Sequence, residues 1–158
     1  MKQKRKAFTI IELVFIIIII GILAAISIPK LVANRDDASA AVCVNEVGQL
    51  IHEISNAYMK NPYEKFIQMH IDEISKLNTN ISLTHGIHEN ASSKIHLTGV
   101  TYYCAGEEIV KLKGDTTGSR YLLKISEAHP VNPIGKKVLK ILENIYNMTS
   151  DNGKVYKL

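Results

Sequence analysis

The N-terminal part of the chain is dominated by one run of apolar residues. From Phe8 to Ile28 the sequence holds a single charged residue, Glu12. About 20 apolar residues in a helix span the hydrocarbon core of a membrane, whereas the apolar part of a cleaved signal peptide is about 7–15 residues long. Helical periodicity also continues beyond the run, from Lys30 to Lys60. The pattern therefore predicts a retained transmembrane helix over residues 8–29.

A second apolar pattern follows the first at helical spacing. It consists of Ala40, Cys43, Val47, Leu50, Ile54 and Ala57. Such a stripe predicts that the same helix leaves the membrane and lays one face on a globular head. Asn61-Pro62 is typical of a helix start, and the apolar residues from Phe66 to Leu77 then predict a second amphipathic helix.

The rest of the chain carries strand signals and one more helix. We expect a strand over 95–103 with Gly99 as a bulge, and a hairpin formed by 108–113 and 120–125. Residues 78–93 are mostly polar and predict a loop, which has room for a short strand at 81–84. Asn132-Pro133 repeats the helix-start signal, and apolar residues at 138–145 support a C-terminal helix. These elements predict an α+β domain.

Charge is concentrated at the N-terminus. The net charge is +4, and four of the 19 basic residues lie among the first seven residues, which contain no acid; the other 15 equal the 15 acidic residues in number. Basic residues before an apolar helix mark its cytoplasmic side. A nucleic-acid-binding protein needs a basic patch on its folded surface, so we expect no nucleic-acid binding by the head.

Glu12 is the exception within the apolar run. A carboxylate in a membrane helix is costly unless it is paired or lies near the headgroups. One interpretation is a shallow, partly hydrated residue without a role. The other is a cationic partner, such as a free N-terminal amine generated by cleavage just before Phe8.

The segment AFTIIELVFIIIIIGILAAISIPKL resembles the leader and N-terminal helix of type IV pilins and of the pseudopilins of type II secretion and competence systems. Members have a short basic leader, a small residue, a Phe and then a Glu at the fifth mature position. The basic residues of 1–7, Ala7, Phe8 and Glu12 match in that order, although the family usually has Gly where this chain has Ala7. The resemblance covers about residues 1–35.

This resemblance implies roles for individual residues. The leader, residues 1–7, would be removed by a prepilin peptidase between Ala7 and Phe8, Phe8 would be N-methylated, and Glu12 would serve subunit assembly. Gly21 and Pro29 fall where many members have helix-loosening residues. Glycine costs a helix about 1 kcal/mol, and proline removes a backbone donor.

The resemblance also implies an architecture and a function. The fold would be pilin-like, with a long N-terminal helix, its first half transmembrane, packed on a small antiparallel sheet with additional helices. Residues 30–158 would form a periplasmic head on a single-pass inner-membrane protein with a cytoplasmic leader. The chain would be a pseudopilin or minor pilin of a filament in the periplasm or at the cell surface, serving type II secretion, DNA uptake or type IV pili. Its partners would be the peptidase, other subunits and an inner-membrane assembly platform. The alternative is an unprocessed single-span protein with a periplasmic binding or enzymatic head.

Other candidate chemistry is sparse. His85-x-x-His88 with Glu89 lacks a third ligand at a known spacing, and Asp115 and Asp151 are explained by turn chemistry. No nucleophile, phosphate-loop or dinucleotide motif occurs. We therefore expect no catalytic residue, metal or cofactor.

Cys43 and Cys104 are the two cysteines. A disulfide between them is expected if the head faces an oxidising periplasm, and free thiols if it does not. Closing so long a loop would stabilise the fold by about 4 kcal/mol on the chain-entropy account. Two separate buried thiols are the alternative.

The leader resemblance generates a prediction about processing. Ala7→Leu should block cleavage, because a site that accepts Gly or Ala before the scissile bond has little room for a branched side chain. Ala7→Gly is the matched control and should be cleaved at least as well as the parent. Gel mobility of each variant, expressed with its peptidase, measures this. If the Ala7→Leu variant is cleaved as well as the parent, the bond between Ala7 and Phe8 is not the processing site.

Overall fold

The computed structural model describes residues 8–77, 79, 85–87, 89, 93–96, 98–115 and 121–146, together with the backbone of 154–157. The leader with Ala7 and the strand expected at 81–84 lie outside these residues. The chain divides into two compact units, Met1–Asp36 and Asp37–Leu158. Helix α1 (Ile10–Lys60) is 51 residues long and contributes to both units.

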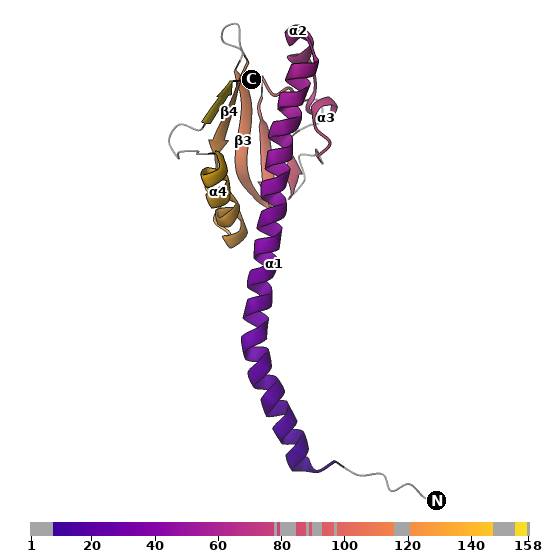
Figure 1. Cartoon of the computed structure of the whole chain (residues 1–158), viewed down its shortest axis with the longest axis vertical. Coiled ribbons are helices and arrows are strands. Elements are labelled where there is room, and N and C mark those ends of the chain that lie inside the picture. The colour runs from indigo at the N-terminus through magenta and orange to yellow at the C-terminus, as the bar shows by residue number, and fades with distance from the viewer. Residues whose placement is uncertain are drawn as a thin grey trace, which may run out of the picture. The chain divides into compact units, whose positions relative to one another are not determined.

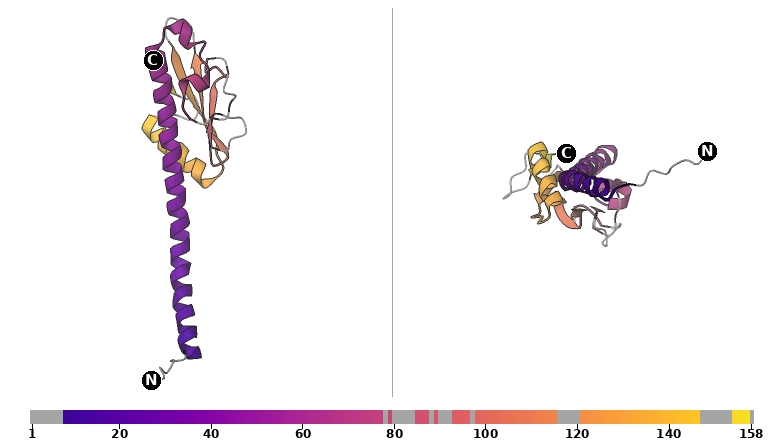
Figure 2. Two further views of the ribbon diagram at one scale, coloured as in Figure 1. Left: turned by 90° about the vertical axis from the view of Figure 1, so that its right-hand side faces the viewer. Right: turned by 90° about the horizontal axis from the view of Figure 1, so that it is seen from below.

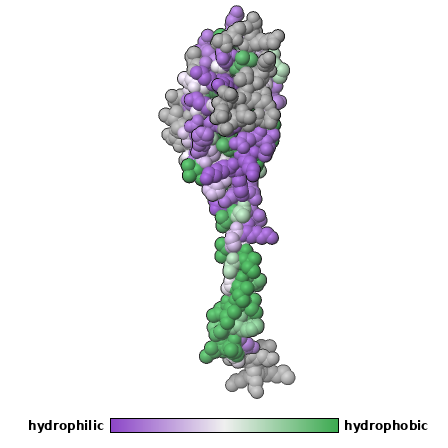
Figure 3. Space-filling view, turned by 90° about the vertical axis from the view of Figure 1, so that its left-hand side faces the viewer, coloured by the Kyte–Doolittle hydropathy of each residue, from purple (hydrophilic) through white to green (hydrophobic). Residues whose placement is uncertain are grey.

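The first unit consists of the N-terminal part of α1, and its apolar side chains are uncovered. The fractional exposure of its large apolar residues runs from 39% at Val14 to 83% at Ile10, and no residue of its most apolar 18-residue window is buried. Apolar side chains accordingly fill the face of this segment seen in Figure 3. Among the described residues, α1 is the one helix long and apolar enough to cross a membrane, judged by length and composition.

The second unit is built on an antiparallel five-stranded sheet (Figure 1). Its strands lie in sequence order, each paired with the next. They are β1 (Gly86–Ile87), β2 (Val100–Cys104), β3 (Glu107–Asp115), β4 (Leu122–Glu127) and β5 (Lys154–Lys157). Two four-residue helices, α2 (Tyr63–Phe66) and α3 (Ile71–Ile74), lie between α1 and β1, and the longer α4 (Pro133–Tyr146) lies between β4 and β5.

The second half of α1 and helix α4 lie side by side on one face of the sheet (Figures 1 and 2). The stripe expected from the sequence is the buried face of α1: Ala40, Cys43, Val47, Leu50 and Ile54 are at most 1% exposed. Alternate residues of the strands, among them Tyr102, Val110, Leu112, Leu123 and Ile125, are buried in the same core. The expected α+β fold is confirmed.

Helix α4 begins where the sequence predicts. Asn132 caps it, because its side-chain oxygen accepts a hydrogen bond from the backbone N–H of Gly135. The carboxylate of Glu107 accepts two more, from the backbone N–H groups of Val131 and Asn132, at 2.8 and 2.9 Å. Val138 and Leu142 then turn into the core.

Three sequence expectations need correction. The second amphipathic helix is two four-residue helices, α2 and α3, because His70 takes an extended conformation (φ −86°, ψ 160°) and caps α3. The strand expected over 95–103 begins only at Val100, after Gly99 at φ +76°, and the irregularity in its pairing lies between Tyr102 and Tyr103. The third correction is an addition: strand β5, after the C-terminal helix, was not expected from the sequence.

A close approach between Gly114 and Tyr121 yields a stability prediction. A Cβ atom at Gly114 would lie 1.8 Å from the Tyr121 hydroxyl oxygen. The ring cannot retreat easily, because it packs edge-on to Phe66 with 4.8 Å between centroids and stacks on Tyr58. Gly114→Ala should therefore lower the free energy of unfolding by about 1–3 kcal/mol or more.

Urea unfolding of the full chain in detergent micelles measures this change. Lys113→Ala is the matched control, because Lys113 is exposed on the same strand, and it should change the unfolding free energy by less than about 0.5 kcal/mol. Equal effects of the two substitutions would contradict the packing account.

Candidate functional site

The start of α1 is the first candidate site. The Glu12 carboxylate oxygen Oε2 accepts hydrogen bonds from the backbone N–H and from the hydroxyl of Thr9, at 2.9 and 2.7 Å. The Thr9 hydroxyl in turn accepts from the backbone N–H of Glu12, at 3.4 Å. The Thr9 carbonyl oxygen accepts a hydrogen bond from the backbone N–H of Leu13, as in a regular helix. This reciprocal pattern is a capping box, which satisfies donors that a helix N-terminus leaves free.

The capping box gives Glu12 a local partner that the sequence interpretation overlooked. The Thr-x-x-Glu spacing of Thr9 and Glu12 before an apolar run was a readable signal for it. Both bonds use Oε2, and no bond among the described residues reaches Oε1. The carboxylate can therefore cap its own helix and still accept a bond from a cation.

Helix α1 is continuous through Gly21 and Pro29. A Cβ atom at Gly21 would meet nothing within 4 Å, so no packing within the chain requires glycine there. The loosening of the helix by Gly21 and Pro29 stays a prediction.

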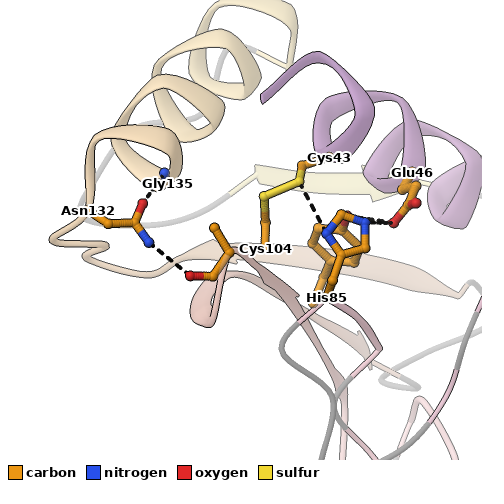
Figure 4. Close-up of a disulfide and its surroundings, with 8 residues drawn as sticks. Cys43, Glu46, His85, Cys104, Asn132 and Gly135 are labelled. Atoms are coloured by element: carbon orange, nitrogen blue, oxygen red, sulfur yellow. Dashed lines mark hydrogen bonds and ion pairs between the residues drawn. A yellow bond between two sulfur atoms is a disulfide. The ribbon is translucent and has the colours of Figure 1, made fainter. Parts of the chain in front are cut away.

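The second candidate site is a cluster around a disulfide that joins α1 to β2 (Figure 4). Cys43 and Cys104 are bonded, with their Cα atoms 6.1 Å apart and 1% of each residue exposed. The bond fixes the buried face of α1 to the sheet. Because it closes a loop between residues 61 positions apart, the chain-entropy account gives it about 4 kcal/mol of stabilisation.

Three side chains from separate elements meet beside this disulfide. The imidazole of His85, next to β1, places Nδ1 3.7 Å from the Cys43 sulfur and Nε2 3.0 Å from a carboxylate oxygen of Glu46 on α1. The same oxygen accepts a hydrogen bond from the Tyr102 hydroxyl, at 2.7 Å. Burial, and then the hydrogen bond and charge of Glu46, raise the pKa of Tyr102 well above its usual value. The phenol therefore stays protonated and donates.

This cluster was not foreseen, and no short motif connects its members. Local spacing instead places His85 with His88 and Glu89. His88 lies outside the described residues, and Glu89 accepts a hydrogen bond from the Thr101 hydroxyl instead, at 3.3 Å. His85 and Glu46 meet only because the sheet and α1 fold together, which local spacing does not reveal.

Comparison with known proteins bears on the first site. The family model of the prokaryotic N-terminal methylation motif matches residues 2–28. The type II secretion system core protein G of Klebsiella michiganensis is 35% identical over 46 residues, which are 29% of this chain and 32% of that protein. The match thus spans about a third of the relative's length. The chain matches no solved structure.

The methylation motif and the long apolar helix that begins within it indicate a protein anchored in the inner membrane. The N-terminal segment of this chain thus carries the prokaryotic N-terminal methylation motif and is similar to that of a type II secretion core protein.

Proposed function

We propose that this chain is a pseudopilin or minor pilin that is cleaved between Ala7 and Phe8, methylated on Phe8, and assembled into a filament through the apolar half of α1. The observation that carries the proposal is the uncovered apolar surface of the first unit, where no part of the described chain shields the side chains. Lipid covers such a surface before assembly, and neighbouring α1 helices cover it afterwards.

Glu12 would set the register of that assembly. In the core of a helix bundle, an unpaired carboxylate costs several kcal/mol. Cleavage before Phe8 creates an amine, and a neighbouring subunit's amine can bond the Glu12 oxygen that the capping box leaves free. One axial stagger satisfies both charges, so the pair would select a single packing arrangement.

The disulfide supports a periplasmic head. Disulfides persist in oxidising compartments, and Cys43 and Cys104 both lie in the second unit. The basic residues before α1 favour a cytoplasmic leader. The proposed domains are therefore a leader at 1–7, a transmembrane segment at 8–29 and a periplasmic head at 30–158.

The partners follow from this arrangement. They would be a prepilin peptidase, other pilin or pseudopilin subunits and an inner-membrane assembly platform. Similarity to a type II secretion core protein favours a secretion filament over DNA uptake or surface pili. The rival from another class remains an unprocessed single-span protein with a binding or enzymatic head.

Glu12→Gln tests the charge pair directly. Glutamine accepts the same capping bond from Thr9, so the substitution keeps the helix cap and removes only the charge. Membrane insertion should be unchanged or improved, because the acid opposes it. Incorporation into filaments should fall more than tenfold, as measured by the ratio of this chain in sheared or pulled-down filaments to that in membranes.

Thr9→Val is the matched control, since it loses the hydroxyl part of the cap and keeps the carboxylate. It should be incorporated close to the parental level. Normal incorporation of Glu12→Gln would contradict charge pairing. An equal defect in both variants would assign the effect to helix capping instead.

A further inference from the structure

The cluster at the disulfide contains three side chains that bind soft metal ions. The ligand atoms of Cys43, His85 and Cys104 all lie within 4.8 Å of one another. We propose that the reduced protein binds Zn²⁺ through these three residues, and that forming the disulfide abolishes the site. The proposal is independent of the filament function.

The spacing of His85 and Cys43 fits two ligands of one ion. In tetrahedral zinc sites the Zn–S distance is about 2.3 Å and the Zn–N distance about 2.0–2.1 Å, which places the nitrogen about 3.6 Å from the sulfur. Nδ1 of His85 lies 3.7 Å from the Cys43 sulfur. A disulfide sulfur has no proton to donate, so this approach is not a conventional hydrogen bond when the imidazole is neutral with a bare Nδ1.

Glu46 favours one tautomer of the neutral imidazole. Its carboxylate oxygen lies 3.0 Å from Nε2 and can accept the ring N–H there, and in that tautomer the lone pair of Nδ1 faces the sulfur. The Tyr102 hydroxyl holds the same carboxylate at 2.7 Å. Histidines that bind metals commonly donate their other N–H to a carboxylate in this way, which fixes the ring and its tautomer. Glu46 is therefore a positioning residue for the proposed site.

Reduction would complete the ligand set. An external dithiol cleaves the S–S bond: it supplies two electrons and two protons, leaves both cysteines as thiols, and becomes a cyclic disulfide itself. Zn²⁺ then displaces the two thiol protons as two Zn–S bonds and one Zn–N bond form. The sulfurs must move to about 3.8 Å apart, and side-chain rotation allows this because the Cα atoms are already 6.1 Å apart.

The fourth position would be open to water. The His85 side chain is 45% exposed, so one side of the cluster faces solvent, while both cysteines are buried. Three protein ligands and one water complete a tetrahedral zinc site. In the reduced chain the ion would take over the role of the disulfide, because it too joins α1 to β2.

The test compares reduced and oxidised full-length protein in detergent micelles, with a phosphine as reductant. Zn²⁺ affinity is measured by competition with a chromophoric chelator, and Co²⁺ serves as a spectroscopic probe for thiolate coordination. We expect one Zn²⁺ per reduced chain, thiolate-to-cobalt charge-transfer bands, and no binding by the oxidised chain. Glu46→Gln should weaken binding about 10–100-fold, and His85→Ala at least as much.

His52→Ala is the matched control, because His52 is an exposed histidine on α1, the helix that carries Cys43. The Zn²⁺ affinity of this variant should equal that of the parent protein. Should reduction alone loosen the fold, Zn²⁺ must restore the near-ultraviolet circular dichroism of the reduced chain. The proposal is overturned by an absence of Zn²⁺ binding after reduction, by equal binding in the oxidised state, by unchanged affinity in His85→Ala, or by failure of Zn²⁺ to restore a loosened fold.

Discussion

Helix α1 carries two apolar surfaces that different surroundings must cover. In residues Asp37–Lys60 the apolar surface is a narrow stripe, buried against the sheet and tied to β2 by the disulfide. In the first unit the apolar residues surround the helix, and the described chain covers none of the most apolar window. The head depends on the first arrangement for its core. The proposed anchoring and assembly depend on the second, because lipid or neighbouring helices would have to shield that surface.

The features readable from sequence were those fixed by local periodicity and capping. The stripe through Leu50 repeats at helical spacing, so the buried face of that segment could be assigned from the sequence alone. The run from Phe8 to Ile28 is apolar throughout, so its whole surface could be assigned in the same way. The start of α4 was equally clear, since Asn132 caps its own helix. The capping box of Thr9 and Glu12 was also local, and it could have been found from spacing alone.

The features that were not readable depend on contacts between distant elements. His70 breaks the expected second helix because Ile71 joins the core and its backbone N–H bonds to Ser93. Strand β5 is polar and exists through its pairing with β4. The cluster of Glu46, His85 and Tyr102 combines residues up to 56 positions apart, so sequence spacing could not assemble it.

Glu12 and the cysteine cluster divide the chemistry of the chain between its two units. In the proposed function, the charge of Glu12 matters once cleavage creates an amine nearby. In the proposed zinc site, the redox state of Cys43 and Cys104 decides which bonds hold α1 to the sheet. The most direct measurement of the central claim is the mass of the N-terminal peptide from protein purified out of its native membrane. Processing by a prepilin peptidase predicts a peptide that begins at Phe8 and carries one methyl group on its amine. A peptide that begins at Met1 would contradict it and favour an unprocessed single-span protein.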